Sequence, residues 1–296
     1  MSSNLLKNRV IDISRNDNLS LDTLPTTVKI ELTGRCTLDC VFCNHHSMKE
    51  KNIRQKLLSR EDFNIILQQL LTISSVREVG LFYMGESAIH PLLKDFYKEL
   101  KKYKYFTYLT TNATTIENII PAIKYIDSLK VSWNYKNIED FIWKTRSPAN
   151  IYDKIISNIY ELDRLCQSMG KHLTISTIMD SSKNEYISAL KKFDGVDHYW
   201  LPLQTQCGNN EVGIGGVSGE LDHMVKSIPC WSLFKGIYID VDLNVRMCCY
   251  GHHDEHVLGS LKRSSLSEIL KSDKVIQIKQ KHLQGDIPSE CYSCLR

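Results

Sequence analysis

The chain has 296 residues, of which 42% are hydrophobic and 24% are charged, and its formal net charge is only +3. This length allows one large domain, or a large domain and a small one, and the dispersed charge argues against a nucleic-acid-binding protein. No apolar run approaches the ~20 residues that span a bilayer, and the N-terminus lacks a signal peptide's apolar core, so we expect a cytoplasmic protein. Its ten cysteines then favour metal or redox chemistry over disulfides.

Residues 1–27 are polar, and we expect them to form an extended arm. Beyond them, short apolar segments alternate with longer amphipathic ones. The expected strands are 28–32, 76–83, 105–109, 129–133, 173–178 and 198–201, and the expected helices are 59–73, 91–102, 115–126, 151–167 and 183–192. This alternation predicts an α/β fold of right-handed βαβ units around a parallel sheet. In barrels of this kind the chemistry lies at the C-terminal ends of the strands.

Three cysteines follow the first expected strand with the spacing C-x3-C-x2-C, namely Cys36, Cys40 and Cys43. Thiolates suit an iron–sulfur cluster or zinc. Three cysteines can hold a cubane whose fourth iron has no protein ligand, and that iron can bind a small molecule through an amine and a carboxylate. A structural zinc site needs four closed ligands, and His45 or His46 could supply the fourth, so zinc stays open at this point.

The C-x3-C-x2-C motif resembles the signature of the radical S-adenosylmethionine (SAM) superfamily. In that family the open iron chelates SAM, an electron from the cluster cleaves it, and a 5′-deoxyadenosyl radical takes a hydrogen atom from the substrate. The resemblance implies a partial (βα)6 TIM-like barrel over residues 28–204. It also implies a [4Fe–4S] cluster on the three cysteines, SAM as cofactor, and an electron donor such as flavodoxin or ferredoxin.

Several strand ends resemble the SAM-binding motifs of this family. Residues 83–87 (Tyr-Met-Gly-Glu-Ser) look like its Gly-Gly-Glu-Pro motif and match it at the Gly and Glu, although an ordinary turn would also read this way. Asn112 resembles the family's Thr-Asn-Gly, or could cap a helix beginning at Thr115. On this resemblance the expected SAM contacts are Phe42, Gly85, Glu86, Asn112, Ser132, Asn134 and Ser176.

A glycine-rich stretch, which we place at residues 205–228 as a linker or lid, has little periodicity. Behind it, residues 235–247 are typical of a hairpin, and 264–281 of a helix. Four cysteines in this C-terminal part form a closed set, for which zinc and [4Fe–4S] are equally suitable chemically. Their spacing resembles the twitch domain, the short form of the SPASM domain, which implies an α+β domain at 229–296 holding one auxiliary [4Fe–4S] cluster. These cysteines are Cys230, Cys248, Cys291 and Cys294.

Three cysteines lie outside both sets. Cys166 falls in an expected helix, where packing is its expected role. Cys249 adjoins Cys248, and strand alternation would point it the other way, where it could return a hydrogen atom to a substrate radical, as in radical SAM epimerases. Cys207 could do the same from the glycine-rich loop. It is also open whether Cys249 replaces Cys248 as the ligand.

The resemblance implies an enzyme, and the fate of the substrate radical defines its reaction. If a base removes a proton and the auxiliary cluster accepts an electron, an alcohol becomes a ketone, as in twitch-bearing aminocyclitol dehydrogenases. If a thiol returns a hydrogen atom, the carbon is epimerised. We expect the oxidation, with Cys249 and Arg146 as candidate catalytic residues. Arg146 resembles the family's arginine near the SAM carboxylate, but a solvated side chain is the alternative.

The substrate class is an expectation from chain organisation. Residues 1–27 are too few for a domain that grips a leader peptide, so we expect a small polar molecule such as a sugar or aminocyclitol, and no nucleic acid or membrane. Peptide maturation is an alternative. A non-catalytic, metal-cluster-binding regulator is an alternative from another class, and it would not cleave SAM.

Overall fold

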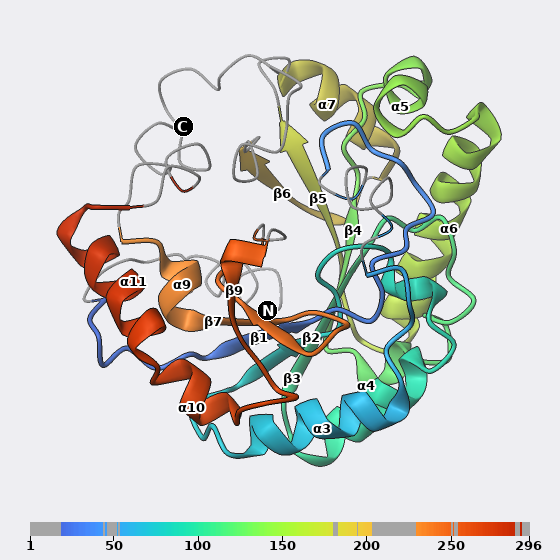
Figure 1. The fold of residues 1–296 in the computed structure, drawn as a ribbon. Coiled ribbons are helices and arrows are strands. Elements are labelled where there is room, and N and C mark those ends of the chain that lie inside the picture. Colours follow the sequence, from blue (N-terminus) through green and yellow to red (C-terminus); the bar gives the residue numbers. More distant parts are fainter. Residues whose placement is uncertain are drawn as a thin grey trace.

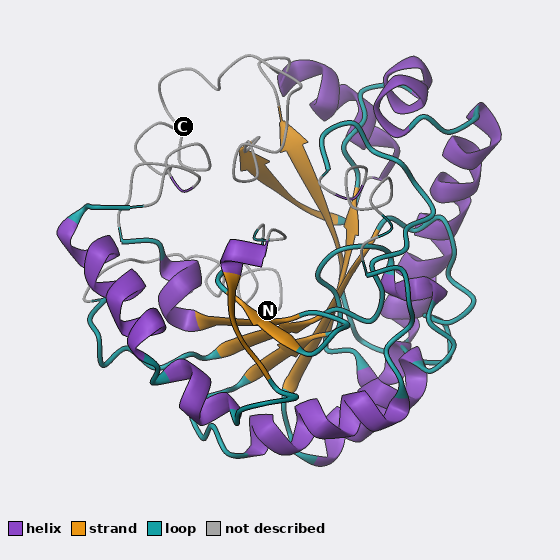
Figure 2. Cartoon of the chain, viewed as in Figure 1, coloured by secondary structure: helices purple, strands orange, loops and turns teal. Residues whose placement is uncertain are grey.

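The computed structural model describes residues 19–43, 45, 52, 54–179, 183–193, 195–202, 229–249, 251, 254–287 and 291. The described strands form one nine-stranded sheet in the order β6-β5-β4-β3-β2-β1-β7-β8-β9. Figure 1 shows this sheet as a curved surface with α3, α4, α6 and α10 along its outer side, and Figure 2 shows the same arc of helices around the strands. The expected linker or lid at 205–228, Cys207, His46 and Cys294 lie outside the described residues.

The first six strands pair in parallel throughout, which confirms the predicted α/β class. Each of the six predicted strands is present, with ends shifted by a few residues. Val28, Val79 and Val131 are fully buried, as expected for a parallel sheet whose strands are covered on both faces. The six strands are β1 Thr27–Ile30, β2 Glu78–Gly80, β3 Phe106–Thr111, β4 Ser128–Ser132, β5 Leu173–Met179 and β6 Asp197–Pro202.

Four of the five predicted helices lie where they were expected. The side chain of Ser59 accepts a hydrogen bond from the Asp62 amide at the start of α3, so this helix begins at the predicted cap. The four are α3 Arg60–Leu71, α4 Leu93–Lys102, α6 Ala149–Ser168, and α7 Lys183–Leu190, which continues into the 3-10 turn η3 Lys191–Phe193.

Two segments differ from the prediction. The helix predicted for 115–126 is wrong: this segment forms turns and the 3-10 helix η2 Ile123–Tyr125. Pro121 has no amide hydrogen to donate and disfavours the helical conformation of the residue before it. The second difference is α5 Ile138–Thr145, a two-turn helix that the sequence interpretation missed; Asn137 caps it through the Asp140 amide.

The C-terminal part extends the same sheet. Strand β7 Gly236–Ile239 pairs in parallel with β1, and β8 Asn244–Arg246 pairs antiparallel with β7, which confirms the predicted hairpin. The single helix predicted for 264–281 is two helices, because Ser272 caps a new one. The other elements are α9 Trp231–Lys235, η4 Asp254–His256, β9 Val257–Ser260, α10 Leu266–Leu270 and α11 Asp273–Gln284. No helix in the described parts of the chain has the length and apolar character needed to cross a membrane.

Candidate functional site

The loop that carries Cys36, Cys40 and Cys43 begins just beyond the C-terminal end of β1. It is anchored on the end of α5, since the Asp39 amide donates to the Thr145 carbonyl (3.2 Å) and the Val41 amide to the Lys144 carbonyl (2.8 Å). The last carbonyls of a helix have no partner within the helix, so the loop satisfies two of them. The missed helix α5 therefore positions the cysteine loop.

The three thiols of this loop are half-buried and form no disulfide. Burial raises the pKa of Cys36 to about 12. It also raises the pKa of Cys40, where the charges of Cys43 and Cys36 add to the effect, and it raises the pKa of Cys43. Ionised thiols at this site would repel one another unless a cationic group lay between them. The donor set therefore fits a metal cluster.

Among the described residues, no three His, Cys, Asp or Glu side chains are grouped as the ligands of a single metal ion would be. A cubane has a different requirement, because each cysteine binds a different iron.

The Gly85–Glu86 segment packs directly against the start of the cysteine loop. Gly85 has φ +73°, and a Cβ atom there would lie 2.4 Å from the Thr33 carbonyl oxygen and 2.5 Å from that of Arg35. The Glu86 amide donates to the Arg35 carbonyl at 2.7 Å. Only glycine allows this close approach at a positive φ, so the resemblance at Gly85 has a physical cause.

Replacing Gly85 with alanine is expected to destabilise the fold by about 3 kcal/mol or more, because the backbone strain and the overlap with two carbonyls add. The affinity for SAM should fall with it. Gly170→Ala is the matched control: Gly170 also has a positive φ (+64°), but nothing lies within 4 Å of the added Cβ. Urea unfolding and SAM titration would measure both effects. Equal losses in the two variants would contradict the close-approach argument.

The Glu86 carboxylate is 3% exposed and is held by three donors. Its Oε1 accepts from the Ala88 amide (3.0 Å) and the Thr111 hydroxyl (2.9 Å), and its Oε2 accepts from the Asn112 amide (2.7 Å). Burial raises its pKa, while the hydrogen bonds from Asn112, Ala88 and Thr111 lower it. The carboxylate is thus oriented at the strand ends, and Oε2 retains a lone pair for a further donor. The sequence interpretation assigned no role to Thr111, which is the buried last residue of β3.

Asn112 connects the end of β3 to the cysteine loop. Its Nδ2 donates to the Thr37 hydroxyl (3.1 Å) and to Cys36 Sγ (3.5 Å). Its Oδ1 accepts from the amide (3.0 Å) and hydroxyl (2.8 Å) of Thr114. The alternative role as the cap of a helix at Thr115 is wrong, because no helix begins there. Asn112 instead caps a turn and contacts a proposed cluster ligand.

Three further expected SAM contacts lie on β4 and β5 or directly after β4. Ser132 and Ser176 are register partners in neighbouring parallel strands. Asn134 follows β4, and its Oδ1 accepts from the Ile178 amide at 2.8 Å, so the Asn134 side chain also ties β4 to β5. Trp133, which directly follows the last residue of β4, is fully buried. Contact of these side chains with SAM stays a prediction.

Phe42 belongs to the cysteine loop, and Arg146 directly follows α5. Phe42 is 7% exposed. Arg146 is the C-cap of α5, with φ +55°, and its Nη1 lies 3.6 Å from Asp39 Oδ2 in the cysteine loop. Arg146 is exposed in spite of this ion pair, which agrees with the solvated alternative. Its role towards SAM or substrate stays a prediction.

The described C-terminal cysteines gather around α9 and the end of β8. Cys230 is the N-cap of α9, and Cys248 and Cys249 follow β8. Burial raises the pKa of Tyr238 well above its usual value, and the charges of Cys249, Cys248 and Cys230 raise it further. Cys291 packs against an apolar cluster formed by Leu233, Phe234 and Met247. This grouping of soft donors fits an auxiliary cluster.

Two details of this region differ from the sequence interpretation. Cys248 and Cys249 lie beyond β8, in a bend and a turn, so strand alternation does not separate their side chains and that argument for Cys249 is wrong. His282 was also missed. Its Nε2 lies 3.7 Å from Cys291 Sγ, and burial lowers its pKa to about 4, so the imidazole beside this thiol is neutral at pH 7.

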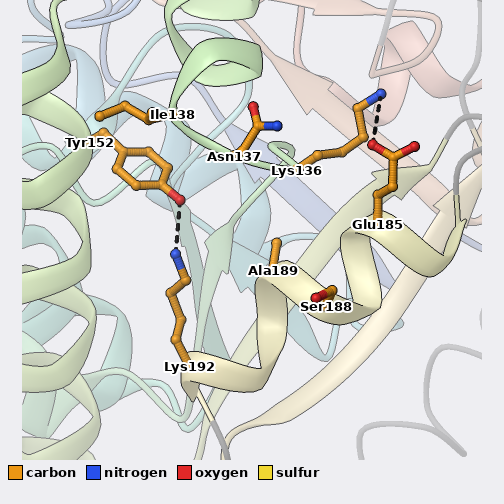
Figure 3. Close-up of a pocket in the computed structure, with 8 residues that line it drawn as sticks. All are labelled: Lys136, Asn137, Ile138, Tyr152, Glu185, Ser188, Ala189 and Lys192. Carbon is orange, nitrogen blue, oxygen red and sulfur yellow. Dashed lines mark hydrogen bonds and ion pairs between the residues drawn. The ribbon is translucent and has the colours of Figure 1, made fainter.

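A cleft of about 520 Å³ lies between α5, α6 and α7 (Figure 3). Lys192 Nζ donates to the Tyr152 hydroxyl at 2.8 Å, and Lys136 Nζ lies 3.8 Å from Glu185 Oε2. None of the residues expected to bind SAM lines this cleft, and we assign it no role in the reaction.

Comparison with protein families agrees with this geometry. A family model described as the radical SAM superfamily matches residues 30–164, and one described as an iron–sulfur cluster-binding domain (SPASM) matches residues 230–295. The chain is a radical SAM protein with a SPASM-type C-terminal region. Radical SAM proteins with this region have a SAM-binding [4Fe–4S] cluster and auxiliary cluster chemistry.

Solved structures of radical SAM proteins share the fold. BtrN in complex with AdoMet and 2-DOIA matches with a TM-score of 0.61 and 13% identity, over 92% of this chain and 94% of that one. Streptococcus suis SuiB bound to the precursor peptide SuiA matches with a TM-score of 0.68 and 14% identity, over 86% and 66% of the two chains. At these identities the likeness supports the fold alone.

A probable GTP 3′,8-cyclase of Pyrococcus horikoshii is 24% identical over 172 residues, which are 57% of this chain and 52% of the cyclase. The present chain thus spans about half the length of this curated relative.

Proposed function

We propose that this radical SAM enzyme oxidises an alcohol carbon of a small polar substrate, such as a sugar or an aminocyclitol. The substrate carbon would lose a hydrogen atom to the 5′-deoxyadenosyl radical, and the hydroxyl would lose a proton. One electron would pass to the auxiliary cluster, leaving a ketone. The observation that supports this proposal is a second set of cysteines beside elements of the same sheet: Cys230 caps α9, Cys248 follows β8, and the neighbouring strand β7 pairs with β1.

Different residues of the chain would hold the first cluster and SAM. Cys36, Cys40 and Cys43 would hold the SAM-binding cluster, whose chemistry, when it is bound, is the reductive cleavage of SAM. Glu86 would accept hydrogen bonds from the SAM amino group, because its carboxylate is already oriented by three donors. The SAM contacts proposed on the other strand ends are Phe42, Gly85, Asn112, Ser132, Asn134 and Ser176.

The auxiliary cluster would be held by Cys230, Cys248, Cys291 and Cys294. Cys249 stays the alternative to Cys248 as ligand, and Cys249 and Arg146 are the proposed catalytic residues. A flavodoxin or ferredoxin in the cytoplasm would supply the electron that cleaves SAM. These assignments are part of the proposal.

The choice of a small substrate is supported by BtrN, whose fold matches over nearly its whole length and which was solved with 2-DOIA. Peptide maturation is the second candidate, and SuiB, solved with a precursor peptide, supports it. An epimerase would use Cys249 or Cys207 as hydrogen donor. A non-catalytic regulator would bind clusters without cleaving SAM.

The test counts iron and sulfide per chain after anaerobic reconstitution, for the wild type and for the Cys291→Ala/Cys294→Ala variant. Two [4Fe–4S] clusters require about eight irons, and the variant should retain about four. Wild type with about four irons and one zinc would overturn the role of the auxiliary site as electron acceptor. The same samples should form 5′-deoxyadenosine under reducing conditions, whereas the regulator would not.

Deuterium at the reacting carbon separates the remaining reactions. In the proposed oxidation, deuterium moves into 5′-deoxyadenosine and the product is a ketone. In an epimerisation the product regains a hydrogen atom from solvent-exchanged thiol, and Cys249→Ala would stop this return. Recovery of solvent hydrogen at the substrate carbon would therefore contradict the dehydrogenase.

A further inference from the structure

Four buried charged side chains form a charge cluster between β1 and the β7–β8 hairpin: Glu31, Arg54, Asp240 and Arg246. Each is at most 5% exposed. Arg54 Nη1 lies 3.3 Å from Glu31 Oε1 and 3.9 Å from Asp240 Oδ2, and Arg246 Nε donates to Asp240 Oδ2 at 2.5 Å. Buried charges are costly unless they are paired. Burial raises the pKa of Glu31 to about 7, against the lowering effect of Arg54, so the cluster depends on its partners staying together.

The charge cluster lies between the two cysteine-bearing parts of the chain. Glu31 follows β1 on the way to Cys36, and its Oε2 accepts from the Val241 amide behind β7 at 3.0 Å. Arg246 is the last residue of β8 and precedes Cys248 by two positions. Arg54 belongs to the segment that follows Cys43, and its carbonyl accepts from the Gly34 amide at 2.8 Å. The four charges thus join the base of one cysteine loop to the base of the other.

Tyr83 rests on this charge cluster and reaches the second loop. The guanidinium carbon of Arg54 lies 5.6 Å from the centre of the Tyr83 ring. The Tyr83 hydroxyl lies 2.9 Å from the carbonyl oxygens of both Cys248 and Gly251, so its single proton is shared between them, and Arg246 Nη1 donates to the Gly251 carbonyl at 3.3 Å. The backbone at Cys248 and Gly251 is therefore held from two sides.

We infer that Tyr83 is a positioning residue that, together with the charge cluster beneath it, fixes the Cys248 turn relative to the Gly85–Glu86 segment and the Cys36 loop. In its redox consequence this inference rests on the proposed function, because only there does Cys248 ligate an auxiliary cluster. Hydrogen bonds and nearby charges set the potential of an iron–sulfur cluster. A shift of this turn would therefore alter the auxiliary cluster and leave the SAM-binding cluster unchanged.

The test compares Tyr83→Phe with Tyr97→Phe in the reconstituted protein. Tyr97 is the matched control, since it is fully buried and its hydroxyl also donates to a backbone carbonyl, that of Tyr108 at 2.8 Å, within the core. Peptide-level hydrogen exchange over residues 247–251 should rise about tenfold in Tyr83→Phe, the effect of losing about one hydrogen bond. It should be unchanged in Tyr97→Phe.

A redox titration followed by electron paramagnetic resonance gives the second readout. The oxidised-to-reduced ratio of the auxiliary cluster at a fixed potential should change at least about tenfold in Tyr83→Phe, which corresponds to 59 mV for one electron. The ratio for the SAM-binding cluster should not change. Wild-type exchange over residues 247–251 in Tyr83→Phe would overturn the inference, as would equal shifts of both clusters.

A second variant tests the inference if Tyr83→Phe folds poorly. Arg246→Lys keeps the positive charge but loses the Nε hydrogen bond to Asp240 and the Nη1 hydrogen bond to Gly251, and exchange should rise over the same residues. Arg60→Lys, which changes an exposed partner of Asp95, is its control. If wild type itself holds no auxiliary cluster, the proposed function fails, but the exchange measurement still decides the role of Tyr83.

Discussion

Replacing Cys40 with alanine is expected to lower the iron content of the reconstituted protein from about eight to about four per chain. Formation of 5′-deoxyadenosine should fall by more than about a hundredfold, because loss of a ligand costs more than the 10–100-fold typical of an outer-shell change. The Cys40 thiol lies in the anchored loop beside Cys36 and Cys43, and each of these pKa values is raised by burial. Without the third thiolate, the cluster loses the arrangement that leaves one iron open to SAM.

Cys166→Ala is the matched control for this prediction. Cys166 is 1% exposed in α6 and packs in the main core, so its replacement tests loss of a buried thiol without loss of a ligand. This variant should keep about eight irons and cleave SAM. Anaerobic iron analysis and chromatography of 5′-deoxyadenosine measure both quantities. Wild-type iron content in Cys40→Ala would show that the loop does not ligate a cluster.

Replacing Glu86 with glutamine is expected to weaken SAM binding by roughly 10–100-fold with the iron content unchanged. A hydrogen bond to a charged group contributes about 1.5–3 kcal/mol, and 1.4 kcal/mol is tenfold in affinity. In glutamine an NH2 group replaces one of the two carboxylate oxygens. Both oxygens of Glu86 accept hydrogen bonds from the chain, Oε1 from Thr111 and Ala88 and Oε2 from Asn112, so the NH2 group would face another donor in either orientation.

Two comparisons make this second prediction specific. Thr111→Val removes one of the donors that orient Glu86 and should weaken SAM binding by a smaller factor. Glu117→Gln changes a nearly fully exposed carboxylate in the turn after β3 and should leave the affinity unchanged. The measurement is an anaerobic SAM titration of the reconstituted proteins. An unchanged affinity in Glu86→Gln would show that Glu86 does not contribute to SAM binding. A parallel loss of iron would show that Glu86 supports the structure of the cluster site rather than binding SAM.

Much of the barrel was predictable because its signals are local. Each parallel strand is a short apolar run, and an amphipathic segment with helical spacing follows most of them, so six strands and four helices were found. The two errors in the helix predictions arose where the local sequence signals do not agree with the structure. The spacing of 115–126 is helical, but Pro121 cannot donate a hydrogen bond. Helix α5 has only eight residues, and part of its stability comes from tertiary contacts, such as the bond from the buried Lys144 ammonium to the Asn134 carbonyl at 3.0 Å.

The sequence by itself predicted the cysteines of the first loop as cluster ligands, because C-x3-C-x2-C places three thiols within one short segment. It also predicted SAM contacts at Gly85 and Glu86, and the close backbone approach at Gly85 gives that residue a physical reason of its own. Tertiary structure alone decided how these residues meet. The hydrogen bonds from Thr111 to Glu86 and from Tyr83 to the Cys248 turn form only because parallel strands end at one edge and β7 pairs with β1. Residues so far apart in sequence carry no periodic or spacing signal of their contact, since the sheet order that joins them is set by the packing of the whole core.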